Sequence, residues 1–571
     1  MYSWRSGAIA VLRLWRRGLM VTVPLILLPF LLSSDSKESK CAYVVFVIGI
    51  YWIAEPIPLG ATSLLPIVLL PLLGVLSTER TCDLYMNETN VMFIGTLIVA
   101  IAIEHSHLHE RMALKTLCLL GTGIKRLVLG LMLISMFLAI WINNVAITAM
   151  MMPVVDSLTK ELFETSEPTI EDDHERVPLS DQSVRVDAFA LPLRSPRESS
   201  RKGQPEASVH VPDILSKSMD PKETQRKRLR VLLYLSVIYG ANTGAITTIT
   251  SAASNIVFKF VVEDVYQSKA PVDYASWLFF ALPIALTSTV LIYISMILLF
   301  VSRRTDVAGG ASTLTVIQKN YNSLGPMRFH EVAVLVLSSL LIFLWVFRDP
   351  MFAKGWATYF GDMKPKDATA VMIVVVLFFV IPARPSDPAR SPGLLTWDIV
   401  QAKLQWSVIF LIGGGFALAE GTRVSGLSHW VGQKLASLQH LSPGVLMTTL
   451  SVICSFISEV ISNAGTVTIL LPVFAALAED LMINPLLLMI PATIASNFAF
   501  LLPVGTPANA IVYEHAKLKV SDMVGPGFVA KSITLLVTAA STYIFGDLVF
   551  DMFSYPEWLA RNTTKTALTE H

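Results

Sequence analysis

Long apolar runs separated by shorter polar connections extend along most of the chain. A helix needs about 20 predominantly apolar residues to cross the hydrocarbon core of a membrane. Several runs approach or exceed that length: 18–33, 43–57, 60–78, 276–301, 332–347, 367–382 and 528–548. A soluble protein would have to bury all of these runs at once. The pattern therefore predicts an all-α, polytopic membrane protein.

Two polar segments interrupt this pattern. Residues 161–229 are rich in Glu, Asp, Ser, Pro and Arg without a sustained apolar period, which predicts a disordered loop. Residues 302–328 form a second polar connection. Arginines before the first apolar run and the basic stretch at 226–230 place the N-terminus and the long loop in the cytoplasm, because cytoplasmic loops carry the excess of positive charge. Asn562 begins a sequon after the last run, which predicts an extracellular, glycosylated C-terminus.

Three blocks of sequence occur twice, in the same order. Residues 91–114 resemble 408–432, residues 137–155 resemble 456–474, and residues 250–258 resemble 504–513. Asn144 and Asn463 are 319 residues apart, whereas Asn255 and Asn509 are 254 apart, and the difference is about the length of the 161–229 insertion. Internal repeats are typical of secondary transporters. About five spans separate the copies, which predicts two inverted repeats.

Polar residues break the apolar runs at equivalent places in the two repeats. One break is Asn143-Asn144-Val145 and the other is Ser462-Asn463-Ala464. Polar groups at membrane depth are costly unless protein, water or ligand satisfies them, and a broken helix offers free N–H groups to an anion and free carbonyl oxygens to a cation. Such residues can instead join neighbouring helices. Their recurrence in both repeats favours a binding site for an anion and a cation.

Glycines and acidic residues add two further expectations. Gly413-Gly414-Gly415, with Gly95 in the equivalent region, predicts the tip of a re-entrant hairpin in each repeat, because glycine permits tight turns. The intramembrane acids Glu55, Glu104, Glu420 and Glu459 are expected to cap helices or to pair with Arg or Lys, with a proton or cation site as the alternative.

Composition narrows the function. Hydrophobic residues make up 53% of the 571 residues and charged residues 15%, against about 25% charged in soluble proteins. The net charge of +1 gives no reason to expect a nucleic-acid partner. The four cysteines fit no metal-binding spacing, and no acid–base constellation accompanies the hydroxyls near Asn463. We therefore expect no cofactor and no enzymatic activity.

Further motifs carry a family resemblance over nearly the whole chain. They are Leu324-Gly325-Pro326, Arg348-Asp349-Pro350, Gly413-Gly414-Gly415-Phe416-Ala417-Leu418-Ala419 and Phe498-Ala499-Phe500-Leu501-Leu502-Pro503-Val504. With them the chain resembles the solute carrier 13 group of sodium–dicarboxylate, citrate and sulfate cotransporters, within the divalent anion–sodium symporter family. It is most similar to the animal dicarboxylate/citrate and insect INDY-like branch.

The resemblance implies a homodimer in which each protomer has a scaffold and a transport domain with two re-entrant hairpins and moves as an elevator. It assigns substrate binding to Asn143, Asn144, Val145, Ser462, Asn463, Ala464, Thr506 and Pro507. It assigns a first sodium site to Asn144, Ser251 and Asn255, and a second to Ser458, Asn463, Gly505 and Asn509.

The first repeat departs from the family pattern. The usual Ser-Asn-Thr is Asn143-Asn144-Val145, and the sodium-binding Ser is replaced by Ala139. Losing an oxygen around a desolvated cation costs free energy of the order of kcal/mol. We therefore expect the first sodium site to be weak or absent, and sodium coupling to be reduced or lost.

Combined with the apolar runs, the resemblance predicts this division of the chain: N-terminal scaffold helices (1–90), first-repeat hairpin and transport segment (91–160), cytoplasmic loop (161–229), first-repeat transport segment (230–265), scaffold helices with the polar loop (266–400), second-repeat hairpin and transport segments (401–525), and last span with the C-terminus (526–571).

The expected function is secondary transport of a small di- or tricarboxylate, such as succinate or citrate, across the plasma membrane, with sodium as the coupling ion and membrane lipid as the surroundings. One alternative is a carrier of sulfate or another inorganic anion. The other is a transport-dead scaffold that binds the anion without moving it.

Overall fold

The computed structural model describes residues 18–29, 31–32, 35–120, 123–164, 221–266, 270–301, 315, 318–319, 321–348, 354–387, 390–435 and 440–559. Within these ranges the chain is helical, and its only strand-like pairing is an isolated bridge between Pro382 and Gly393. The predicted all-α class is confirmed. Asn562 and residues 165–220 of the predicted loop lie outside the described residues.

The helices follow one another in two comparable series. The first series consists of α2 (Lys37–Ala54), α3 (Leu59–Thr62), α4 (Leu65–Leu72), α5 (Thr78–Tyr85), α6 (Glu88–His105), α7 (Leu108–Leu120), α8 (Ile124–Ala139), α9 (Asn144–Glu164), α10 (Pro221–Gly244), α11 (Ala253–Tyr266) and α12 (Tyr274–Phe300). The second consists of α14 (Phe329–Val346), the 3-10 helix η1 (Trp356–Met363), α15 (Asp367–Val380), α16 (Trp397–Lys403), α17 (Trp406–Val424), α18 (Leu427–Leu435), α19 (Pro443–Ile457), α20 (Asn463–Asp480), α21 (Pro485–Ser496), α22 (Pro507–His515) and α23 (Val520–Phe550).

Among the described residues, five helical stretches are long and apolar enough to cross a membrane: Thr78–His105, α12, α14, α17 and α23. The predicted runs at 276–301, 332–347 and 528–548 coincide with α12, α14 and α23. One helix does not cover the predicted apolar run 60–78, because the structure divides it into α3 and α4. Pro66 explains the break, since proline lacks the N–H that a continuing helix would use and favours the first turn of a new one.

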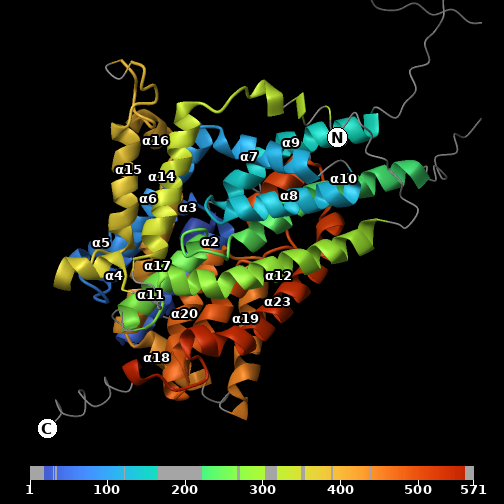
Figure 1. Cartoon of the computed structure of the whole chain (residues 1–571). Helices are drawn as coiled ribbons and strands as arrows, with labels where there is room; N and C mark the ends of the chain where they lie inside the picture. The colour runs from blue at the N-terminus through green and yellow to red at the C-terminus, as the bar shows by residue number, and fades with distance from the viewer. Residues whose placement is uncertain are drawn as a thin grey trace, which may run out of the picture.

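The predicted repeat is visible in the helix starts and in the packing. α7 and α18, α8 and α19, and α9 and α20 each begin 319 residues apart, while α11 and α22 begin 254 apart. Helices of each half pack against helices of the other: α11 lies on α20, α22 lies on α9, and α12 packs along α23. The two repeats are therefore related by an approximate two-fold rotation. Figure 1 shows α7 to α10 in the upper part of the molecule and α18 to α20 in the lower part.

The expected glycine-rich hairpin tip is wrong. Gly413, Gly414 and Gly415 lie inside the continuous helix α17, and Gly95 lies inside α6. These glycines allow close packing instead, because a Cβ on Gly414 would lie 2.5 Å from Ser63 O and one on Gly95 would lie 2.7 Å from Val371 Cγ1. The tips are formed by the short turns 140–143, between α8 and α9, and 458–462, between α19 and α20. Each hairpin tip thus carries one of the two Asn motifs.

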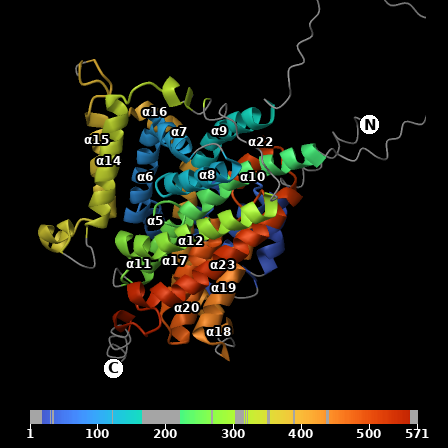
Figure 2. The same ribbon diagram turned by 45° about the vertical axis from the view of Figure 1, so that its right-hand side comes forward.

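A smaller group of helices lies beside the hairpins. α6 packs on α15 and α14, and both figures show α14 and α15 at one side of the molecule (Figures 1 and 2). α10 begins at Pro221, inside the predicted loop, so the basic stretch at 226–230 is helical. The division of the chain into scaffold and transport segments stays a prediction.

The contact between α8 and α10 generates a first test. A Cβ on Gly240 would overlap the Met132 carbonyl oxygen and lie 3.0 Å from Met132 Cα, so Gly240→Val must push the two helices apart. Overpacking of this kind costs about 1–3 kcal/mol or more. We expect a lower Tm and loss of the monodisperse peak in size-exclusion chromatography. Gly525→Val in α23 is the matched control, since nothing lies within 4 Å of its Cβ; equal effects of the two changes would contradict the packing argument.

Candidate functional site

The two Asn motifs begin the second helix of each hairpin. Asn143 Oδ1 accepts a hydrogen bond of 2.8 Å from the Val145 N–H at the start of α9. Ser462 Oγ accepts one of 3.2 Å from the Gly465 N–H at the start of α20. Each side chain thereby satisfies one of the N–H groups that a helix start leaves free. The remaining N–H groups, with the positive end of the helix dipole, suit an anion.

In the first repeat, the chain between α10 and α11 is not helical, and Asn255 bonds to the backbone of this break. Asn255 Nδ2 donates to Ala245 O at 3.0 Å and to Thr248 O at 2.8 Å. Ser251 Oγ lies close to the same two carbonyl oxygens, at 2.6 Å and 2.7 Å. These side chains satisfy carbonyl groups that the break would leave without a partner in a dry interior.

The second repeat has the same arrangement between α21 and α22. Asn509 Nδ2 donates to Ala499 O at 2.9 Å and to Leu502 O at 3.0 Å. The accepting residues precede the Asn by ten and seven positions, as they do in the first repeat. Asn255 and Asn509 therefore have the same structural role, and both are fully buried.

Two further carboxamides join the repeats across the two-fold axis. Asn497 Nδ2 donates to Asn255 Oδ1 at 3.0 Å, and Asn242 Nδ2 lies 3.4 Å from Asn509 Oδ1. Ser254 Oγ donates to Asn497 Oδ1 at 2.7 Å. Neither Asn242 nor Asn497 is among the site residues predicted from the sequence. The repeat carried a signal for them, since they precede Asn255 and Asn509 by thirteen and twelve residues.

Asn144 is linked to the second repeat through one of these bridges. Its Nδ2 donates to Asn242 Oδ1 at 2.9 Å. Asn144 is thereby connected through Asn242 to Asn509, whereas Ser251 bonds within its own loop and Asn255 also accepts from Asn497. Of the three residues expected at the first sodium site, Ser251 and Asn255 share the carbonyl oxygens of Ala245 and Thr248, whereas Asn144 bonds to Asn242 instead.

The second predicted site offers an oxygen without a partner. Asn463 Oδ1 is buried and accepts no hydrogen bond from the described residues, and the same holds for Thr466 Oγ1 one turn later. Ser458 is fully buried, and its hydroxyl donates to Ser455 O at 3.0 Å. A carboxamide oxygen without a donor suits a hard cation, which binds through oxygen ligands. The second repeat therefore fits a sodium ion.

The other predicted binding residues lie at the adjoining helix starts. Thr506 Oγ1 accepts from the Asn509 N–H at 3.2 Å and caps α22, whose first residue, Pro507, is exposed. Gly505 is buried, and a Cβ there would lie 3.0 Å from Glu459 Oε2. Ala464 is 5% exposed, whereas Val145 is half-buried beside Asn144.

Comparison with known proteins identifies the family. Residues 12–552 match the family described as "Sodium:sulfate symporter transmembrane region". The chain belongs to this family. The predicted resemblance is thereby confirmed, and the chain is a member of an integral membrane transporter family, not of an enzyme family.

Named relatives of this symporter chain are animal transporters. It is 34% identical to a Na(+)/citrate cotransporter of Rattus norvegicus over 94% of this chain and 95% of the relative. It is 34% identical to Na(+)/dicarboxylate cotransporter 3 of Rattus norvegicus over 94% and 93%, and 33% identical to solute carrier family 13 member 2 of Homo sapiens over 96% and 95%. The solved structure of the Alcanivorax borkumensis YdaH transporter aligns with 84% of this chain and 90% of its own, at 12% identity and a TM-score of 0.49.

Three of the four intramembrane acids of this symporter pair with cations, and the fourth, Glu55, is the C-cap residue of α2. Glu104 lies 2.7 Å from Lys403 Nζ, and Glu420 lies 2.7 Å from Arg423. Glu459 lies 2.9 Å from Lys531 Nζ and also accepts backbone N–H groups at residues 500–502.

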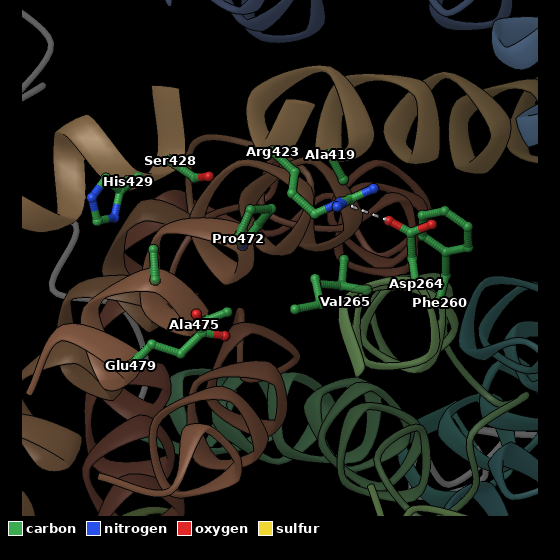
Figure 3. Close-up of a pocket in the computed structure, with 12 residues that line it drawn as sticks. Phe260, Asp264, Val265, Ala419, Arg423, Ser428, His429, Pro472, Ala475 and Glu479 are labelled. Atoms are coloured by element: carbon green, nitrogen blue, oxygen red, sulfur yellow. Dashed lines mark ion pairs between the residues drawn. The ribbon is translucent and has the colours of Figure 1, made fainter. Parts of the chain in front are cut away.

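A cavity of about 160 Å³ lies apart from the hairpin tips, between α11, α17, α18 and α20. Figure 3 shows Arg423 and Asp264 joined across one end of it, with His429 toward the other. Their ion pair measures 3.4 Å, and Glu420 shares the same guanidinium. No residue predicted for substrate or sodium lines this cavity. Its charges hold helices together away from the candidate site.

The bridge between Asn255 and Asn497 allows a double-mutant test. Removing one partner leaves a buried carboxamide unsatisfied, at a cost of about 1–3 kcal/mol. We expect Asn255→Ala and Asn497→Ala each to lower the Tm of the purified protein, and the double variant to lose less than the two losses added together. Asn484→Ala is the control, because Asn484 is equally buried but bonds to Leu486 and Asp551. Additive losses for Asn255 and Asn497 would show that the bridge carries no coupling.

Proposed function

We propose that this chain carries small di- or tricarboxylates, such as succinate or citrate, across the plasma membrane by secondary active transport. The single observation that supports this best is the joining of the two helix breaks, α10–α11 and α21–α22, by carboxamide bridges between the repeats, with Asn144 of the first hairpin tip bonded to one of the bridging residues. The relatives are named as citrate and dicarboxylate cotransporters, which supports a carboxylate rather than sulfate as the transported anion.

The chemistry of the proposed site follows from the two helix starts. The free N–H groups of α9 and α20 and the amide groups of Asn144 and Asn463 donate to the carboxylates of the anion. Sodium, as a co-substrate, binds at the second repeat, where Asn463 Oδ1 and the region of Ser458 and Gly505 supply oxygen. The first repeat contributes mainly to the anion, because Ala139 lacks the hydroxyl that would complete its sodium site.

Transport then requires that the site face the two sides of the membrane in turn. We propose that the repeats cross the membrane in opposite orientations and that the hairpins move as a unit against the remaining helices, as an elevator within a homodimer. α14 and α15 pack on α6 and on each other rather than along the hairpin helices α8, α9, α19 and α20, which supports such a division. The N-terminus lies in the cytoplasm and the C-terminus outside.

Uptake into proteoliposomes tests the proposed function. We expect labelled succinate or citrate to be taken up faster than sulfate, with a shallow sodium dependence when choline replaces sodium. A steep, multi-ion dependence on sodium would overturn the reduced coupling. Faster uptake of sulfate would favour the inorganic-anion alternative, and binding of succinate without uptake would favour the transport-dead scaffold.

Ser458→Ala tests the second sodium site without relying on transport. Losing one oxygen ligand should weaken sodium binding by about tenfold or more, since 1.4 kcal/mol corresponds to a factor of ten. The measurement is the sodium concentration that gives half of the maximal Tm rise. Ser451→Ala is the matched control, because Ser451 also bonds to a carbonyl of α19, at 2.8 Å from Met447 O. Equal sodium affinities in the two variants would exclude Ser458 as a ligand.

A further inference from the structure

Lys531 places a positive charge inside the second repeat, in the middle of the apolar helix α23. Its side chain is 1% exposed. Its Nζ lies 2.7 Å from Ser455 O, 2.8 Å from Ser455 Oγ and 2.9 Å from Glu459 Oε1. Three oxygen atoms thus match the three N–H groups of one ammonium. The ammonium is coordinated as a small bound cation would be.

Glu459 connects this ammonium to the candidate sodium site. Its Oε1 accepts from Phe500 N at 2.9 Å, and its Oε2 accepts from Leu502 N at 3.1 Å. Residues 500–502 belong to the break between α21 and α22, whose carbonyl groups Asn509 holds in place. Glu459 also directly follows Ser458 in the chain and faces Gly505. The carboxylate therefore lies immediately behind the second site.

The first repeat makes the equivalent connection without charge. Trp277 in α12, 254 residues before Lys531, donates from Nε1 to Ile246 O at 2.9 Å. Thr248 Oγ1 donates to the carbonyl oxygen of Ile140, the residue 319 positions before Glu459, at 2.9 Å. Neutral groups are thus sufficient to join these helices in this fold.

A buried ion pair is not needed for stability either. Desolvating two charges costs about as much as their attraction returns, and apolar replacements are often neutral or stabilising. Ionisable residues at membrane depth are rare and generally have a functional role. The charges of Glu459 and Lys531 therefore call for a function beyond the joining of helices.

We propose that Lys531 is a tethered cation that permanently occupies a cation position formed by Ser455 and Glu459 behind the second sodium site. Without Lys531, a free cation would have to neutralise Glu459 in each transport cycle. Lys531 is thereby a residue that sets the number of coupled cations, and it lowers that number by one.

Lys531→Ala tests the proposal by leaving Glu459 without its ammonium. We expect sodium, relative to choline, to raise the Tm of purified Lys531→Ala protein more than it raises that of the wild type, because the vacated oxygens bind a free cation. This measurement needs neither a substrate nor transport. In the double variant Glu459→Gln with Lys531→Ala no carboxylate needs a cation, so the additional rise of the Tm with sodium should disappear.

Lys259→Ala controls for the loss of any buried lysine. Lys259 is 2% exposed and lies 3.1 Å from Asp367, but that carboxylate keeps a second partner, Arg348, at 3.0 Å. We therefore expect Lys259→Ala to lower the Tm similarly in both salts. A sodium effect of equal size in Lys259→Ala and Lys531→Ala would overturn the specific role of Lys531.

Uptake provides the second readout and rests on the proposed function. In Lys531→Ala, the Hill coefficient for sodium should rise by about one, because one more free cation participates. If wild-type protein moves no succinate or citrate, the proposed function fails while the Tm comparison still decides the cation position. An unchanged sodium effect on Tm, or a Lys531→Ala protein that is unfolded in both salts, would overturn the proposal.

Discussion

A helix that breaks inside an apolar interior leaves carbonyl and N–H groups that bulk water does not reach, and the rest of this structure depends on how they are satisfied. Asn255 and Asn509 do so in the two repeats, each by bonding two carbonyl oxygens of its own loop. Each loop is then held by a carboxamide from the other repeat. Closing one broken helix therefore requires the other, and the candidate site lies where they meet.

The two repeats share this Asn-held helix break but differ in the side chains that surround it. In the first, a hydroxyl of the loop bonds to the hairpin tip and an indole bonds to one loop carbonyl, and Asn144 is already bonded to Asn242. In the second, a carboxylate and an ammonium hold the loop, and Asn463 Oδ1 accepts no hydrogen bond from the part of the chain that the structure describes. A two-fold frame with unequal chemistry is suited to binding two unlike species, an anion shared by both halves and a cation in one.

The charge pair explains how such an asymmetry is maintained. Glu459 is buried within the second hairpin tip, where an uncompensated carboxylate would be costly. A lysine from α23 compensates it at all times, whereas a diffusible ion would do so only when bound. The same carboxylate fixes the backbone at 500–502, so the charge balance and the shape of the site are linked through one residue.

The sequence alone determined the helical class, most long apolar helices, the repeat and the two Asn motifs, because hydrophobic periodicity and internal similarity are local properties of a chain. It also indicated that the intramembrane acids pair with cations. The glycine run was misread as a turn, since glycine also serves close helix packing and only the neighbouring Ser63 and Tyr85 distinguish the two uses. Tertiary structure decided the bridges of Asn242 and Asn497 and the pairing of Glu459 with Lys531. Two-fold packing brings together residues that are not equivalent in the repeat, and no alignment of the two halves can show such partners.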